Sequence, residues 1–379
     1  MSYYILPKTN NNITLNPLLD ICKANTYTSH SLFYHYQEIY SQLIKQCNNN
    51  DSINSIENLL KLINPYEFIF SKVPGSNFSV SKLKPKTCIF YDFLEILINS
   101  NIFENFKNTD MKSLQITPNY LDTIYCSELL RENQKDEVLY FPEINEELYQ
   151  TIGSKTFDFI FFEIEPILFG DLNMYILKML EFLKIIFKHQ NSNGVSIIKI
   201  DNVFYKPIID IIYIFTSIYE KTFIVKPNAS NITTFEKYIV CKNFIVDENK
   251  IDLYIKNYHQ LTEFINAYSY TINLNISSII DKDIPYFFIN KIDDMNIIIG
   301  QQQLESINQI INILKNKNKD DKIESIKKTN IQKSVNWCEK FKIPCNKFSE
   351  KINIFLPITK EITIFNESNN ESNNESLLL

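Results

Sequence analysis

Glycine is scarce in this chain, which contains only 5 glycines among 379 residues. Asparagine, isoleucine, lysine and tyrosine are used heavily instead, a bias typical of an AT-rich genome, so asparagine-rich stretches are weak evidence for loops. Long hydrophobic runs are also missing, because no apolar stretch approaches the ~18 residues that cross a bilayer. We therefore expect no membrane-spanning segment.

Paired cysteines, clustered histidines and an excess of positive charge are absent as well. The 7 cysteines are scattered without a CxxC pair, and the sequence MSYYILPKTN does not resemble a signal peptide, so we expect reduced thiols in a cytosolic protein. The 4 histidines are not clustered, which argues against a histidine-rich metal site, and no metal is predicted. The net charge of −6 argues against nucleic-acid binding over the whole surface, but not against a local basic groove.

What is present is enough apolar material for a substantial core. Hydrophobic residues make up 45% of the chain and aromatic residues 13%, which excludes wholesale disorder. Apolar patterns of strand and helix length alternate over residues 113–246, which indicates crossover connections and a mostly parallel sheet. Two of the strands are separated by about ten residues with no helix between them, so one of these is expected to be antiparallel. The expected strands are 113–117, 137–141, 156–164, 195–200, 221–227 and 237–246, and the helices between them are 120–133, 172–190 and 206–219.

The segments on either side of this α/β section differ from it. We predict a helical N-terminal extension over 1–68, the α/β domain over 69–250 and a C-terminal helical segment over 251–365. The remaining residues, 366–379, repeat Asn-Glu-Ser and are expected to be disordered.

The most informative stretch is 193–244. Lys199 lies on a short apolar strand, and Glu236 opens a second one. A charged side chain in a buried strand is costly unless it has a partner or a task, although a lysine at a strand end can also extend into solvent. The segments GVSIIKI and YEKTFIVKPNASNITTFEKYIVCKNF resemble the FtsJ-like RNA 2′-O-ribose methyltransferases, in the cap-directed form found in giant and other large DNA viruses. SVNWCEKFKIPC (334–345) is similar to the C-terminal part of giant-virus members.

This resemblance implies a Rossmann-like methyltransferase fold with a seven-stranded, mostly parallel sheet and helical extensions at both ends. It also implies a Lys-Asp-Lys-Glu tetrad, in which a lysine of lowered pKa accepts the proton of a ribose hydroxyl. Lys199 falls on the second lysine of the tetrad and Glu236 on its glutamate. TCIFYDFLEI places Asp92 at the first lysine, and FDFIFFEIEP places Glu163 at the aspartate. Two of the four catalytic positions are therefore altered.

The cofactor implied by the resemblance is S-adenosylmethionine, which such enzymes approach through a glycine-rich turn after the first strand. The corresponding sequence, LQITPNYLDT, contains no glycine. The candidate cofactor-binding residues are therefore Thr117, Pro118 and Asn119 in this turn, with Glu143 after the next strand as a ribose ligand. Bulkier side chains in the turn are expected to intrude on the pocket.

The basic run SKLKPK (81–86) falls on the expected substrate face. Lys82, Lys84 and Lys86 are candidates for RNA phosphate contacts, and a solvated loop is the alternative interpretation.

Two functions remain open from the sequence. The first is a methyltransferase-fold protein that binds the 5′ end or cap of mRNA as a catalytically impaired subunit. It would use no cofactor and would work with a protein partner in a viral capping, polyadenylation or translation assembly. The second is an active S-adenosylmethionine-dependent mRNA cap 2′-O-ribose methyltransferase. Either would act in the host cytoplasm, at the viral factory, or in the virion.

Overall fold

The structure is a computed structural model that describes residues 1–9, 12–21, 25–48, 53–132, 134–165, 171–245, 248–268, 274–315 and 319–346. The predicted disordered tail, 366–379, lies outside the described residues.

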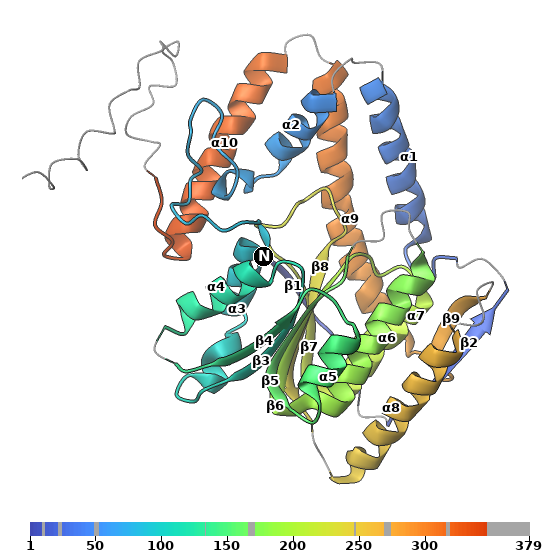
Figure 1. The fold of residues 1–379 in the computed structure, drawn as a ribbon. Coiled ribbons are helices and arrows are strands. Elements are labelled where there is room, and N and C mark those ends of the chain that lie inside the picture. The colour runs from blue at the N-terminus through green and yellow to red at the C-terminus, as the bar shows by residue number, and fades with distance from the viewer. Residues whose placement is uncertain are drawn as a thin grey trace, which may run out of the picture.

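A mixed seven-stranded sheet forms the centre of the molecule (Figure 1). β3, β4, β5 and β6 pair in parallel, whereas β8 is antiparallel to both β6 and β7. The predicted α/β class and the mostly parallel sheet are confirmed, and the architecture is compatible with a Rossmann-like fold. The expectation that one of the strands 221–227 and 237–246 is antiparallel is also confirmed, and that strand is β8. In spatial order the strands are β1 (Ser2–Ile5), β7 (Tyr219–Lys226), β8 (Lys237–Phe244), β6 (Gln190–Ile200), β5 (Phe157–Glu163), β3 (Lys112–Ile116) and β4 (Glu137–Phe141).

The N-terminus differs from the expected helical extension. β1 is an edge strand of the main sheet, antiparallel to β7, so the first residues of the chain complete the seven strands. β2 (Leu15–Asp20) pairs with β9 (Asn275–Ile280) in a small second sheet, which also places a strand in the expected C-terminal helical segment. Both terminal segments therefore combine strands with helices, because pairing with distant strands satisfies their backbone groups.

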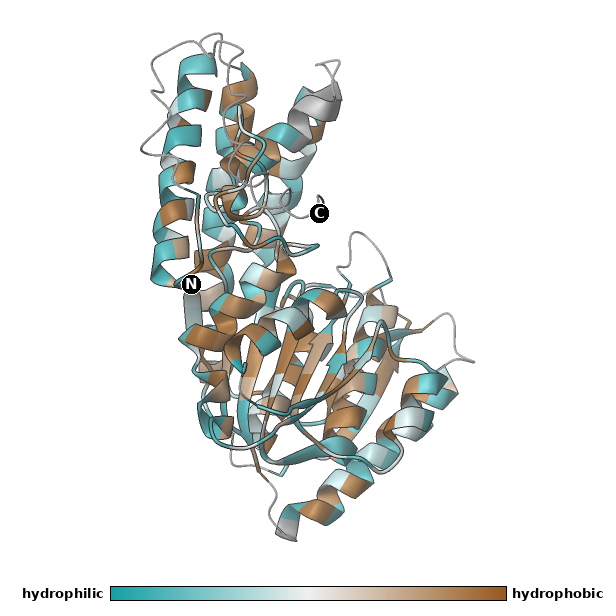
Figure 2. Ribbon diagram, turned by 60° about the vertical axis from the view of Figure 1, so that its left-hand side comes forward, coloured by the Kyte–Doolittle hydropathy of each residue, from teal (hydrophilic) through white to brown (hydrophobic). Residues whose placement is uncertain are grey.

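The strands carry apolar side chains on both faces, as a doubly covered sheet requires. In β5, Phe159 and Phe161 enter one core, and Ile160 and Phe162 enter the other. Figure 2 shows the hydrophobic strands enclosed by helices whose outer faces are more hydrophilic. The first core includes α5 (Glu146–Ile152), α6 (Leu172–His189), α7 (Lys206–Ile218) and α8 (Glu248–Tyr268). The second includes η1 (Glu67–Ile69), α3 (Ile89–Asn99), η2 (Ile102–Phe106), α4 (Tyr120–Leu130) and the end of α10 (Lys319–Lys340).

A helical layer stands above the carboxyl ends of the parallel strands (Figure 1). It has its own small apolar core, which includes Leu43, Leu59, Ile307 and Ile310. The layer consists of α1 (His30–Asn48), α2 (Ile53–Ile63), α9 (Tyr286–Lys315) and α10. Within the described ranges, every helix is too short or too polar to cross a membrane.

Candidate functional site

The candidate site lies at the edge of the sheet where parallel strands end. Glu163 is the last residue of β5, and its register partner on β6 is Lys199. Glu236 precedes β8, which runs antiparallel to β6, so the start of β8 lies at the same edge as the end of β6. The sheet topology therefore brings together three residues that are far apart in the sequence, and all three were predicted as site residues.

The ammonium group of Lys199 is held between two carboxylates. Its Nζ lies 3.0 Å from Oε1 of Glu163 and 3.2 Å from Oε1 of Glu236. The three side chains are 13%, 8% and 21% exposed, so solvent screens these pairs only in part. Burial alone lowers the pKa of Lys199, but the charges of Glu236 and Glu163 outweigh burial and raise the pKa above its ordinary value. Lys199 therefore carries its proton at neutral pH.

Asp92, on α3, adds a third carboxyl to the cluster. The hydroxyl of Tyr238 donates to its Oδ2 at 3.0 Å, and within the described part of the chain Oδ1 has no hydrogen-bond partner. The pKa of Asp92 is raised to about 7, chiefly by burial, with Lys199 opposing the rise and Glu236 adding to it. The position expected to hold a lysine thus carries an acid that titrates near neutral pH.

A buried lysine that the sequence reasoning did not select positions Glu236. Lys226, at the end of β7, donates to the backbone carbonyls of Asn231, Thr234 and Glu236 at 2.8, 3.0 and 2.7 Å. These three bonds fold the segment between β7 and β8 around one ammonium group. Burial lowers the pKa of Lys226 to about 8, and the nearby carboxylates Glu236 and Asp92 oppose this effect.

Lys237 is a second buried lysine that the sequence reasoning did not select. Its Nζ donates to the backbone carbonyl of Asp201 at 3.0 Å, and burial lowers its pKa to about 7. A lysine next to a strand end is usually exposed. The pairs Lys226-Pro227 and Glu236-Lys237 therefore gave no clear indication that these two lysines are buried. The hydrophobic residues around each pair were the available signal.

The turn after β3 contains the predicted cofactor residues, but its polar groups bind the protein itself. The hydroxyl of Thr117 and the side-chain amide of Asn119 both donate to Oε2 of Glu163. The backbone N–H of Thr117 donates to the carbonyl of Phe141, and that of Asn119 donates to the Thr117 hydroxyl. Pro118 has no N–H. The turn therefore offers no free backbone donor at these three positions.

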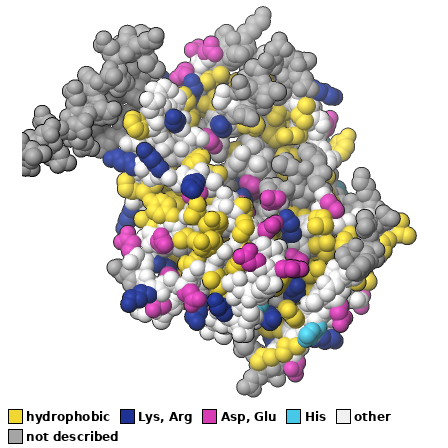
Figure 3. Space-filling view, in the orientation of Figure 1, with side chains coloured by type: hydrophobic (Ala, Val, Ile, Leu, Met, Phe, Trp, Pro, Cys, Tyr) yellow, Lys and Arg dark blue, Asp and Glu magenta, His cyan; other side chains and the backbone are white. Residues whose placement is uncertain are grey.

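A cavity of about 620 Å³ lies beside this turn, at the ends of β3, β4 and β5 and against α6 and α8. Its volume is in the range of small-molecule sites. Among the described residues that line it, Lys178 is the one cation. The acidic lining residues are Glu143, Glu163, Glu165, Asp171 and Glu181, and the apolar ones include Pro118, Phe162, Met174 and Ile265. Figure 3 shows acidic side chains gathered near the centre of this face.

S-adenosylmethionine fits this cavity in volume, but the turn after β3 does not offer its carboxylate the contacts that the resemblance implies. Its sulfonium and amine would suit an acidic lining, but its carboxylate needs hydrogen-bond donors or a cation. The donor groups of Thr117 and Asn119 are already bound within the protein, and Glu143 and Glu163 would repel a second carboxylate. Lys178, the one cation among the described lining residues, lies on α6 and not in this turn. The residues present therefore do not fit the cofactor in the way that the resemblance implies.

The predicted RNA-binding lysines lie outside the cluster. Lys82, Lys84 and Lys86 are all exposed, on the segment that leads into α3. The backbone N–H groups of Lys86 and Thr87 donate to the carboxylate of Asp122 at 2.8 and 2.7 Å, which fixes the end of this segment.

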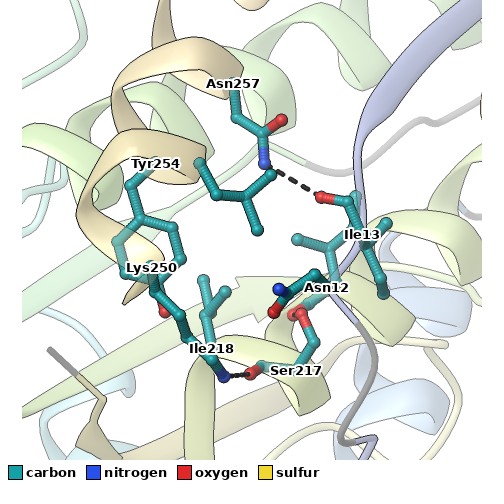
Figure 4. A pocket seen from close by; sticks show the side chains of 9 residues that line it. Asn12, Ile13, Ser217, Ile218, Lys250, Tyr254 and Asn257 are labelled. Carbon is teal, nitrogen blue, oxygen red and sulfur yellow. Dashed lines mark hydrogen bonds between the residues drawn. The ribbon is translucent and has the colours of Figure 1, made fainter. Parts of the chain in front are cut away.

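Two further hollows differ from the cavity beside β3. The one in Figure 4 measures about 10 Å³, the least that holds a single water molecule. There Asn257 of α8 donates to the carbonyl of Ile13, and Lys250 donates to that of Ser217, so the side chains tie the N-terminal segment and α7 to α8. The other, about 490 Å³, lies at the opposite end of the sheet around Arg131. In the described part of the chain, no three or more His, Cys, Asp or Glu residues group in a way that could hold a metal ion.

Comparison with known proteins adds no assignment, because no protein-family model and no curated protein sequence matches the chain.

Proposed function

We propose that this protein is a methyltransferase-fold RNA-binding protein of a large DNA virus that does not itself transfer methyl groups. It would bind the 5′ end or cap of mRNA, as a subunit of a capping, polyadenylation or translation assembly in the host cytoplasm or the virion. The lineage rests on the resemblance of 193–244 to the FtsJ-like RNA 2′-O-ribose methyltransferases.

The sheet supports a Rossmann-like methyltransferase fold for this proposal. The chain moves from β3 outward to β4 and then returns to the other side of β3 with β5. Ligands of open α/β sheets bind at such a reversal, outside the carboxyl ends of the strands. Thr117 and Glu163 lie at this point, after β3 and at the end of β5, and are hydrogen-bonded to each other.

The observation that carries the loss of methyl transfer is the pairing of Lys199 with two carboxylates. A ribose hydroxyl is a weak nucleophile, so methyl transfer needs a base that is free to accept its proton. Lys199 is bound to Glu163 and Glu236, and its pKa is raised rather than lowered. Asp92 adds negative charge where the family has a lysine. The cluster therefore stabilises a protonated Lys199, which cannot act as the general base that the resemblance assigns to it.

The alternative is an active S-adenosylmethionine-dependent cap 2′-O-ribose methyltransferase. One observation favours it: a cavity of about 620 Å³ adjoins Glu163 and includes Pro118 and Glu143 of the predicted cofactor site. Activity would require Lys199 to lose its proton, which its two carboxylates oppose.

Two measurements on the full chain distinguish these functions. Calorimetry with S-adenosylmethionine tests the cofactor, and transfer of a labelled methyl group to a capped RNA oligomer tests the reaction. We expect neither binding nor transfer. Micromolar cofactor binding, with turnover that disappears in Lys199→Ala, would contradict the proposal.

A third measurement tests the retained RNA function. Fluorescence anisotropy should show binding of capped RNA by the wild-type protein and weaker binding by Lys82→Ala/Lys84→Ala. A matched control is Lys282→Ala/Lys291→Ala, which removes two exposed lysines next to and within the first part of α9. Equal loss of affinity in both variants would argue against a specific RNA surface.

A further inference from the structure

Positive charge is concentrated in two segments of a chain whose net charge is −6. Residues 70–86 contain four lysines and no acidic residue, and 319–346 contains seven lysines and four acidic residues. The rest of the chain is correspondingly more acidic than the total suggests. Such an asymmetry is the electrostatic footprint expected for a polyanionic partner, since scattered charges on an ordinary solvated surface show no preference for one region.

The fold brings the two segments side by side. The backbone N–H of Lys82 donates to the carbonyl of Pro344 at 2.8 Å, and that of Asn346 donates to the carbonyl of Val80 at 2.8 Å. Ser81 and Cys345 form a β-bridge between these bonds. The residues that follow α10 are therefore fixed against the basic segment before α3. Figure 3 shows Lys and Arg side chains gathered in this region, at the upper left of the view.

We name six of the exposed residues of this region the basic platform: Lys72, Phe78, Lys82, Lys84, Lys340 and Lys342.

Phe78 gives the basic platform an aromatic surface. Its side chain is 57% exposed. The turn that carries it is closed by a hydrogen bond of 2.9 Å from the N–H of Val73 to the carbonyl of Phe78. Inside the turn the N–H of Ser76 donates to the carbonyl of Val73, and Gly75 has a φ of +82°, a conformation that favours glycine. The backbone thus holds an exposed phenyl ring on the basic segment, where a nucleobase can stack.

The basic platform also leads toward the Lys199 cluster. After Lys84 the chain passes Lys86 and Thr87, whose N–H groups are fixed by Asp122, and enters α3. α3 carries Asp92, whose pKa responds to the charge of Lys199. The basic segment is therefore continuous with the helix that carries Asp92 of the cluster.

We infer that the basic platform binds single-stranded RNA, with phosphates on the lysines of both segments and one base stacked on Phe78. This inference rests on the proposed function and extends it, because it assigns RNA contacts to Phe78 and to the end of α10. Lysine contacts to phosphate are independent of sequence, and base stacking is tolerant of it, so the binding would be general for single strands.

The experiment measures binding of a 3′-fluorescein-labelled, capped RNA of about 12 nucleotides by anisotropy, in salt from about 50 to about 200 mM. The variants are Lys340→Ala/Lys342→Ala, Phe78→Ala and Phe78→Trp, with Lys282→Ala/Lys291→Ala as the control. Circular dichroism checks that each variant is folded. Phosphatidylserine vesicles serve as a competing polyanionic surface.

The lysine and phenylalanine variants should lose RNA affinity with different salt dependence. Each lost phosphate contact makes the slope of log K against log salt less steep by about 0.7, so Lys340→Ala/Lys342→Ala should make it less steep by about 1.4. Phe78→Ala should weaken binding about tenfold with an unchanged slope, because stacking is not ionic. Phe78→Trp should retain wild-type affinity. The control pair should leave affinity and slope unchanged.

The failures of the two proposals are separable. No binding of RNA by the wild type would overturn the proposed function and this inference with it. Binding that weakens in Lys82→Ala/Lys84→Ala but matches the control in Lys340→Ala/Lys342→Ala would overturn the inference and leave the proposed function standing. Wild-type affinity in Phe78→Ala would overturn the stacking contact. Stronger binding to phosphatidylserine vesicles than to RNA would overturn the inference in favour of a membrane surface.

Discussion

Replacing Lys199 with methionine tests how strongly the two carboxylates depend on its charge. The substitution keeps the volume but leaves Glu163 and Glu236 without their common cation. Removing one partner of a buried ion pair costs about 3–5 kcal/mol, against about 0.2–1 kcal/mol for an exposed pair. The side chains are 8–21% exposed, and Glu163 keeps its bonds from Thr117 and Asn119. We therefore expect a loss of about 3 kcal/mol at pH 7.5.

The pH dependence makes this prediction specific. Because the pKa of Lys199 is raised above 10.5, its pairing contributes stability that is fully present at pH 7.5 and is lost only as pH rises through the folded-state pKa. In Lys199→Met, the two carboxylates repel each other, and acid weakens this repulsion because it favours the uncharged form of a carboxyl group. The loss should therefore be smaller at pH 5 than at pH 7.5.

Urea unfolding followed by circular dichroism measures both values. Lys282→Met, at an exposed site, is the control and should change stability by less than about 0.5 kcal/mol. Adding Glu163→Gln and Glu236→Gln to Lys199→Met should restore most of the stability, since the uncompensated charges are gone. A loss below about 1 kcal/mol at pH 7.5, or an equal loss at both pH values, would refute the reasoning.

Three other substitutions test separate features of the structure. Asp92→Asn should stabilise the protein at pH 8 and flatten the pH dependence of its stability between about pH 4 and 7. The reason is that a carboxyl whose pKa is raised to about 7 opposes folding as it ionises. Thermal unfolding at pH 4.5 and 8 measures this. Gly194→Ala should lower stability by about 1–3 kcal/mol, since its Cβ would lie 2.8 Å from the carbonyl oxygen of Asn191, and an unchanged melting temperature would contradict that contact. Arg131→Met should lower stability by about 3–5 kcal/mol in urea unfolding, because Asp136 would lose the guanidinium that binds both of its carboxylate oxygens. Arg131→Lys should recover only part of this stability, and full recovery would argue against the bidentate geometry.

The parts of the fold that the sequence predicted are those whose signal is local. Alternating or continuous apolar residues identified six strands of the main sheet and three of the helices between them, because each pattern has the period of its element. The seven-residue helix α5 was not predicted. β1 has only four residues and exists because β7 offers it a partner, so no local pattern indicated it. The strand expected over 195–200 begins five residues earlier, at Gln190, so Gly194 lies inside β6, where the backbone of Asn191 approaches closely.

The residues of the candidate site were predictable from the sequence, but the protonation of Lys199 was not. The resemblance selected Lys199, Glu236, Glu163 and Asp92, and the structure gathers these side chains at one edge of the sheet. Whether a lysine beside carboxylates gains or loses its proton depends on distance and burial, which the sequence does not contain. Lys226 was missed for the same reason, since its role depends on three carbonyls that only the folded chain brings to it.

The protonation of Lys199 is the central claim, and NMR of the full chain with ¹³Cε-labelled lysine tests it most directly. Assignment comes from Lys199→Arg, and Lys226 and Lys237, with pKa values lowered to about 8 and about 7, serve as internal references that titrate. The Lys199 signal should remain that of an ammonium group through pH 10. A Lys199 signal that titrates below pH 8 would contradict the account, because the lysine would then be free to act as a base.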